Sequence, residues 1–127
     1  MRAALVSLGL SALIVATPMV VSAAPALRSI MHAWRDDARA THAMLYGRAA
    51  FDEAAIRAAL QRYAADAGSV AARVNGHTAR ARDFKGRFVA FQAQAQATLG
   101  DIGRRPALEA NFSRLINDCQ SCHHVFN

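Results

Sequence analysis

The sequence ends in a short motif that strongly limits what this chain can become. Its last nine residues contain Cys119 and Cys122, followed directly by His123. The spacing Cys-x-x-Cys-His is typical of c-type haem attachment, because two thiols one helical turn apart can each form a thioether with a vinyl group of the same haem. The adjacent imidazole can then ligate the iron. We therefore expect one covalent haem c, held by Cys119 and Cys122, with His123 as the proximal iron ligand.

Other uses of the two cysteines are open as alternatives. A redox pair of the thioredoxin type is found in a βαβ setting, and this sequence has no strand-like alternation. A structural zinc site needs four ligands, and the chain has only these two cysteines. A plain disulfide between Cys119 and Cys122 stays open for a chain that never receives haem. Haem attachment is the interpretation that accounts best for the whole motif.

The N-terminus has the form of a secretory signal peptide. Arg2 supplies a positive charge, and the apolar run that follows, 5–15, is too short to span a bilayer comfortably. Small residues lead up to Ala23, and we place the cleavage site after it, with an uncleaved anchor as the alternative. We thus expect a signal peptide, residues 1–23, and one haem domain, residues 24–127, with no membrane span after cleavage. Bacterial c-type haems are attached outside the cytoplasm, so the expected location is the periplasm.

The chain is basic, with a net charge of +6 from 15 Lys and Arg against 9 Asp and Glu. Removal of the signal peptide lowers this charge by one unit, because it contains a single charged residue, Arg2. A basic surface can bind nucleic acid, an anionic membrane or an acidic protein. Here the arginines are spread at helical intervals without interleaved aromatic residues. We therefore expect a solvated basic surface and no nucleic-acid binding.

Four segments of the mature chain have the hydrophobic period of an amphipathic helix. Glycine or proline stands at the breaks between them. The expected helices are 25–46, 52–74, 78–99 and 106–126. Helices of this length with short links predict an all-α fold, an antiparallel four-helix bundle that carries the covalently bound haem. On the third helix, Phe84, Phe88 and Phe91 are expected to contribute to the apolar wall of the haem pocket.

The expected helix ends carry suitable residues. Gly47 can close the first helix in the left-handed conformation, Asp52 is a good N-cap for the second, and Pro106 suits the first turn of the fourth. The haem motif then lies in the last turns of the last helix. Its cysteines and histidine are therefore expected to be held by regular helical geometry.

Three features of the chain are shared with a known family. The most specific is the motif Cys-x-x-Cys-His-x-x-Phe at the extreme C-terminus, here 119–126. The second is Met31 on the first helix, followed sixteen residues later by Gly47 and Arg48. The third is the acidic cap Asp52 after that turn. On these features the whole mature chain resembles the cytochrome c′ family, including its low-spin members.

This resemblance implies a monohaem cytochrome whose function depends on the distal side of the iron. In low-spin members the methionine at the position of Met31 binds the iron, and the haem transfers electrons between redox partner proteins. In high-spin members the residue at this position leaves the iron five-coordinate and open to NO or CO. We expect electron transfer through a His/Met-ligated haem, with NO/CO binding as the alternative. The family also implies a homodimer formed through the first two helices.

Two further expectations concern the surroundings of the haem. Arg28 is a candidate contact for a haem propionate from the first helix, because charge-assisted pairs are strong. The family commonly has an arginine one position earlier, where this chain has Leu27. A peroxidase would need an acid or base over open iron, and the sequence offers only His32 near Met31 and no paired carboxylates. We therefore expect no enzymatic activity.

Overall fold

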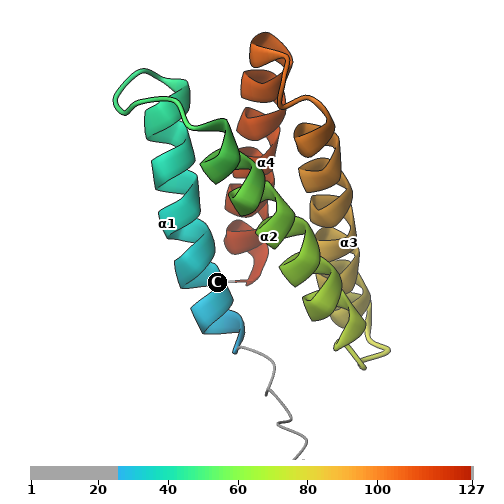
Figure 1. The fold of residues 1–127 in the computed structure, drawn as a ribbon. Coiled ribbons are helices and arrows are strands. Elements are labelled where there is room, and N and C mark those ends of the chain that lie inside the picture. The colour runs from blue at the N-terminus through green and yellow to red at the C-terminus, as the bar shows by residue number, and fades with distance from the viewer. Residues whose placement is uncertain (1–25, 127) are drawn as a thin grey trace, which may run out of the picture.

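The computed structural model describes residues 26–126, so the expected signal peptide lies outside the described residues. Over this range the chain forms four helices and no strand: α1 (Leu27–Leu45), α2 (Glu53–Ala72), α3 (Ala79–Gly100) and α4 (Arg105–Phe126). Successive helices run in alternating directions (Figure 1), which is compatible with a four-helix bundle. The all-α prediction is confirmed. None of the described helices has the length and apolar character needed to cross a membrane.

The helix ends follow the predicted local chemistry closely. Gly47 has φ of +74°, the left-handed conformation expected after α1. The side chain of Asp52 caps α2 by accepting a hydrogen bond from the Ala55 amide at 3.0 Å. Thr78 caps α3 in the same way, at 3.1 Å from the Ala81 amide. The helix α2 ends two residues earlier than predicted, at Ala72.

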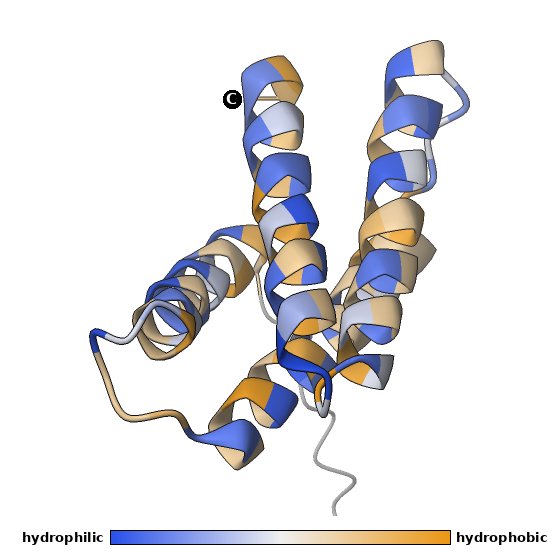
Figure 2. Cartoon of the chain, turned by 90° about the horizontal axis from the view of Figure 1, so that it is seen from above, coloured by the Kyte–Doolittle hydropathy of each residue, from blue (hydrophilic) through white to orange (hydrophobic). Residues whose placement is uncertain are grey.

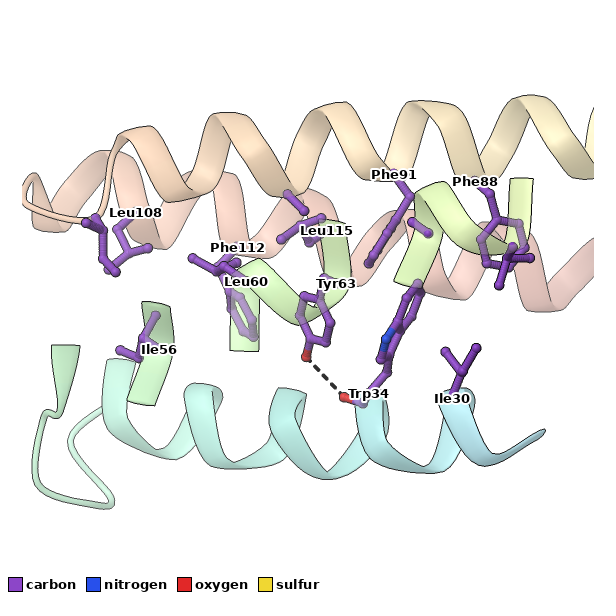
Figure 3. Close-up of a cluster of buried hydrophobic side chains, with 14 of the residues drawn as sticks. Ile30, Trp34, Ile56, Leu60, Tyr63, Phe88, Phe91, Leu108, Phe112 and Leu115 are labelled. Atoms are coloured by element: carbon purple, nitrogen blue, oxygen red, sulfur yellow. Dashed lines mark hydrogen bonds between the residues drawn. The ribbon is translucent and has the colours of Figure 1, made fainter. Parts of the chain in front are cut away.

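Hydrophobic residues from all four helices meet in one core. Figure 2 shows that each helix carries hydrophilic residues on part of its circumference and hydrophobic residues on another part. This two-sided pattern is what allows one stripe of each helix to be buried. The large side chains that are almost completely buried come from α2 and α4, as labelled in Figure 3: Ile56, Leu60, Leu108, Phe112 and Leu115.

Trp34 joins α1 to α2 and α3. Its indole N–H donates to the Asp66 carboxylate at 3.0 Å, and its ring stacks on Phe91 with centroids 4.8 Å apart. Tyr63 packs edge-on against the indole, and its hydroxyl donates to the Trp34 carbonyl at 3.0 Å (Figure 3). Burial raises the pKa of Tyr63 above its ordinary value, so the hydroxyl stays a donor across the physiological pH range.

The four helices are not equally close to one another. Within residues 26–126, close backbone contacts join α1 to α2, α2 to α3 and α3 to α4, and α1 and α4 are not among these pairs. Side chains connect α1 and α4 near the first turns of α4. There Arg105 donates to the Leu45 carbonyl at 2.5 Å, and the hydroxyls of Tyr46 and Ser113 lie 3.5 Å apart. The helices α1 and α4 are therefore packed less closely than the three pairs of consecutive helices.

A buried amide holds the turn between α3 and α4. Asn111 is 9 % exposed, and its Nδ2 donates to Asp101 at 2.5 Å. Its Oδ1 accepts hydrogen bonds from Arg114 at 2.8 Å and from Gln94 at 3.3 Å. One side chain thus satisfies three polar groups in a partly buried place.

We expect Asn111→Ala to lower the free energy of unfolding by about 1–3 kcal/mol, because it leaves partly buried partners without their hydrogen bonds. Urea unfolding of the purified protein measures this change. Asn117→Ala is the matched control, since Asn117 is exposed on the same helix, and its effect should stay within about 0.5 kcal/mol. Equal losses in the two variants would show that the Asn111 hydrogen bonds do not stabilise the turn.

Candidate functional site

Two adjoining cavities lie between α1 and the second half of α4, with residues of α3 in the lining of both. The smaller has a volume of about 110 Å³ and the larger about 600 Å³. Five residues line both of them, which makes the two cavities parts of one hollow: Met31, Trp34, Phe91, Cys119 and His123. Sites for small molecules and cofactors are commonly concave, mostly apolar and of about 300–1,000 Å³. The larger cavity lies within that range.

The antiparallel run of the helices brings the two ends of the described chain to this hollow. In Figure 1 the end of α4 lies close to the first half of α1. Met31 of α1 and His123 of α4 consequently line the same space, although they stand at opposite ends of the sequence. Cys122 lines the smaller cavity and Cys119 lines both. All four residues that the sequence predicts as thioether sites or iron ligands are thus brought together.

The last turns of α4 have little protein packed over them. The first half of the helix buries Leu108, Phe112 and Leu115 in the core. After Leu115, none of the described residues of α4 is fully buried, and Ile116 and Cys119 are only partly covered. An apolar helix face without a protein partner is stabilised when another apolar body covers it. The motif therefore lies on the part of α4 that has room for such a body.

Contacts with α3 hold the end of α4 in place. Phe126 packs edge-on against Phe84, with ring centroids 5.2 Å apart, and the Arg80 guanidinium lies 4.7 Å from the centre of the Phe126 ring. One turn earlier, Arg87 donates to the Ser121 hydroxyl at 3.1 Å. These contacts lie within the motif, at Ser121, and three residues after it, at Phe126, so they hold the last turns of α4 against α3.

The two cysteines differ from a reactive redox pair. Both are free thiols. Burial raises the pKa of the Cys119 thiol to about 11, with Asp118 and Cys122 adding to the rise. Burial also raises the pKa of Cys122, although Arg87 opposes this change. Redox-active thiols usually have lowered pKa values, often at a helix N-terminus, whereas this pair lies at the C-terminal end of α4, where the helix dipole disfavours a thiolate.

The residues around the hollow have the chemistry that a haem requires. Its lining is mainly apolar, as the flat ring of a haem needs, and includes Trp34, Phe88 and Phe91. Two thiols in one turn, an imidazole and a thioether open onto it. For the zinc alternative, residues 26–126 contain no cluster of three or more His, Cys, Asp or Glu side chains that could hold a metal ion. The residues present therefore fit a haem better than a bare metal ion.

The other residues predicted for the site do not all line the hollow. Phe88 and Phe91 both line the smaller cavity, as a pocket wall would. Phe84, also expected in the wall, lines neither cavity and packs against Phe126 instead. Arg28 is exposed in the first turn of α1 and lines neither cavity. Sequence reasoning did not single out Arg39, which lines the larger cavity, and gave no role at the site to Arg48, which also lines it. The spacing from Met31 to Arg39, two steps of four residues on one helix, is the signal that could have indicated the first of them.

The chain matches no protein-family model, no curated protein and no solved structure. Its function is therefore inferred from the residues and cavities described above.

Proposed function

We propose that this chain is a periplasmic monohaem c-type cytochrome of cytochrome c′-like fold, which transfers electrons through a His/Met-ligated haem. One observation carries the proposal. Met31 of α1 and the Cys-x-x-Cys-His motif of α4 line a single apolar hollow between loosely packed helices. The sequence resemblance supports the same conclusion, because its two most informative features, Met31 and the motif, are the ones that meet there.

Each residue of the hollow has a role in this proposal. Cys119 and Cys122 would attach the haem, which supplies a one-electron iron couple when bound. His123 would hold the iron from α4. Met31 is a soft thioether ligand that favours the reduced iron and raises its potential. Trp34 and its neighbours on α3 exclude water, which also favours the less charged, reduced state.

Several contacts hold the part of α1 that carries Met31. Trp34 lies one turn further along α1 and lines the same cavities. Its orientation is fixed by Asp66, by the Tyr63 hydroxyl and by the stacked ring of Phe91. These contacts would keep the Met31 thioether in place beside a bound haem. Donor and acceptor redox proteins are the expected partners, and the homodimer stays a prediction from the family resemblance.

A second candidate function has one observation in its favour. The partly buried side chain of Met31 packs against the hydrophobic core, and a methionine on a helix stripe often serves only as packing. A Met31 that packs without binding would leave the iron five-coordinate and able to bind NO or CO. The two candidates therefore differ in one bond, between the Met31 sulfur and the iron.

Met31→Leu tests this bond directly, because leucine keeps the apolar volume and removes the sulfur. We expect the oxidised and reduced optical spectra to change from a six-coordinate, low-spin form to a high-spin form that binds carbon monoxide. Met44→Leu is the matched control. It makes the same change on the same helix, at a buried position that lines neither cavity, and should leave the spectra unchanged.

An unchanged spectrum in Met31→Leu would contradict ligation by this methionine. If the parent protein already binds carbon monoxide rapidly with a high-spin spectrum, NO/CO binding replaces electron transfer as the function. Haem attachment through the cysteines would stand in either case.

A further inference from the structure

One end of the larger cavity is positively charged. Arg35 and Arg39 follow Met31 along α1 at intervals of four residues, so the three side chains share one side of the helix. All three line the larger cavity, as does Arg48 from the turn after α1. The lining thus changes along α1 from an apolar region near Met31 and Trp34 to a cationic region near Arg39 and Arg48. Such a cavity suits a ligand with an apolar body and acidic groups at one edge.

The charges at this end are not neutralised by the protein. Within residues 26–126, Arg39 makes no side-chain hydrogen bond or ion pair. The guanidinium of Arg48 makes a hydrogen bond to the Nδ1 atom of His42, at 3.4 Å, and no ion pair with a described carboxylate. Arg35, by contrast, pairs with Asp36 at 3.4 Å. No described carboxylate lines the larger cavity, so among its arginines Arg39 and Arg48 are the two without an ion pair to a described residue.

The position of the motif determines which edge of a haem would reach these arginines. In the proposed haem, the vinyl groups would be joined to Cys119 and Cys122, and the propionates are carried on the part of the ring away from the vinyls. Cys122 lines only the smaller cavity, while Arg39 and Arg48 line only the larger one. Cys119 lines both cavities, so the attachment points run from the smaller cavity to its junction with the larger one, and the cationic end of the larger cavity lies away from Cys122.

We infer that Arg39 and Arg48 bind the propionate carboxylates of the haem, an inference that rests on the proposed haem. Guanidinium groups are well suited to this contact because they can donate two parallel hydrogen bonds to one carboxylate. An acidic partner protein is another ligand that arginines can bind. The cavity favours the propionates, because its arginines border an apolar hollow that would be filled by the ring carrying them.

The experiment compares the midpoint potentials of holoproteins at pH 7 and at least 0.1 M salt. In the Arg39→Gln/Arg48→Gln variant, the propionate charges lose their counter-ions and stabilise the oxidised iron, so we expect a lower potential than in the parent. Arg28→Gln is the matched control: it removes one charge from an exposed, unpaired arginine of the same helix that lines neither cavity. Screening over about 10 Å at this salt should leave its potential close to that of the parent.

Two further comparisons make the result decisive. The Arg39→Lys/Arg48→Lys variant keeps both charges, so we expect its midpoint potential to lie close to that of the parent. A merely structural role of the two arginines would not explain this recovery. If the double glutamine variant accumulates poorly, the double lysine variant still allows the test. The inference is overturned if the double glutamine variant has the same potential as Arg28→Gln. It is also overturned if the double lysine variant has the same potential as the double glutamine variant. Haem staining of each variant separates this failure from that of the proposed function, since a parent protein without covalent haem would contradict the latter.

Discussion

Replacing Cys119 and Cys122 together by alanine should abolish covalent haem attachment. Both thiols open onto the hollow between α1 and α4, and each is expected to form one thioether with the same haem. With both removed, any haem that enters the hollow is held by ligation and packing alone. It would then be lost when the protein is denatured. Haem staining after denaturing electrophoresis measures the effect, which we expect to be complete loss of the stained band.

Variants in the same helical turn control this experiment. Gln120→Ala changes an exposed residue between the cysteines and should keep the full haem stain. Each single cysteine variant retains one thiol and should keep a smaller covalently attached fraction. Haem that survives denaturation in the double variant would mean that another side chain forms the covalent link, and the motif would lose the role given to it here.

The second large effect is expected for Trp34→Ala, which should lower the free energy of unfolding by about 3–5 kcal/mol. Trp34 is 6 % exposed and connects α1 with Asp66, Tyr63 and Phe91. Its removal leaves a cavity beside the hollow and withdraws the main contact that places α1. Urea unfolding followed by far-UV circular dichroism measures the loss.

Trp34→Phe divides this effect into two parts. Phenylalanine keeps an aromatic ring against Phe91 but removes the N–H donor to Asp66, so we expect a loss of about 1–2 kcal/mol. If Trp34→Ala costs no more than Trp34→Phe, the ring contacts of Trp34 do not contribute to the stability of the bundle, and α1 must be held by other residues.

Local sequence patterns predict the helices well because their causes lie within a few residues. Asp52 and Thr78 act as caps through hydrogen bonds to amides three residues later, and Gly47 takes the left-handed conformation because it has no side chain. The end of α2 is less well defined by sequence. Val74 continues the apolar stripe, but the helix ends at Ala72, since helix ends depend on packing as well as on pattern.

The hollow itself is harder to predict from the sequence. Periodicity places Met31, Phe91 and Cys119 on inner faces, but it does not indicate that α1 and α4 are less closely packed than the other neighbours. The distance between two helices depends on the side chains of all four, including the Arg105 contact with the Leu45 carbonyl. The motif's chemistry was therefore visible in the sequence, whereas the space beside it was not.

The sequence also does not indicate which arginine of α1 lines the larger cavity. Arg28 and Arg39 are both on α1, within two or three turns of Met31 and on a similar side of the helix. Sequence reasoning favoured Arg28 because a charge-assisted pair with a propionate is strong, yet only Arg39 lines the cavity. The difference lies in the direction along the helix: the larger cavity extends from Met31 toward the end of α1, and the first turn of the helix lies beyond its other end.

The most direct test of the whole account is the intact mass of the purified, denatured protein, exported from a host that matures c-type cytochromes. We predict the mass of residues 24–127 plus one haem, which requires covalent attachment of a single group. The mass of the polypeptide alone, or that mass less two hydrogens for a disulfide between Cys119 and Cys122, would contradict the account, and the hollow between α1 and α4 would need another ligand.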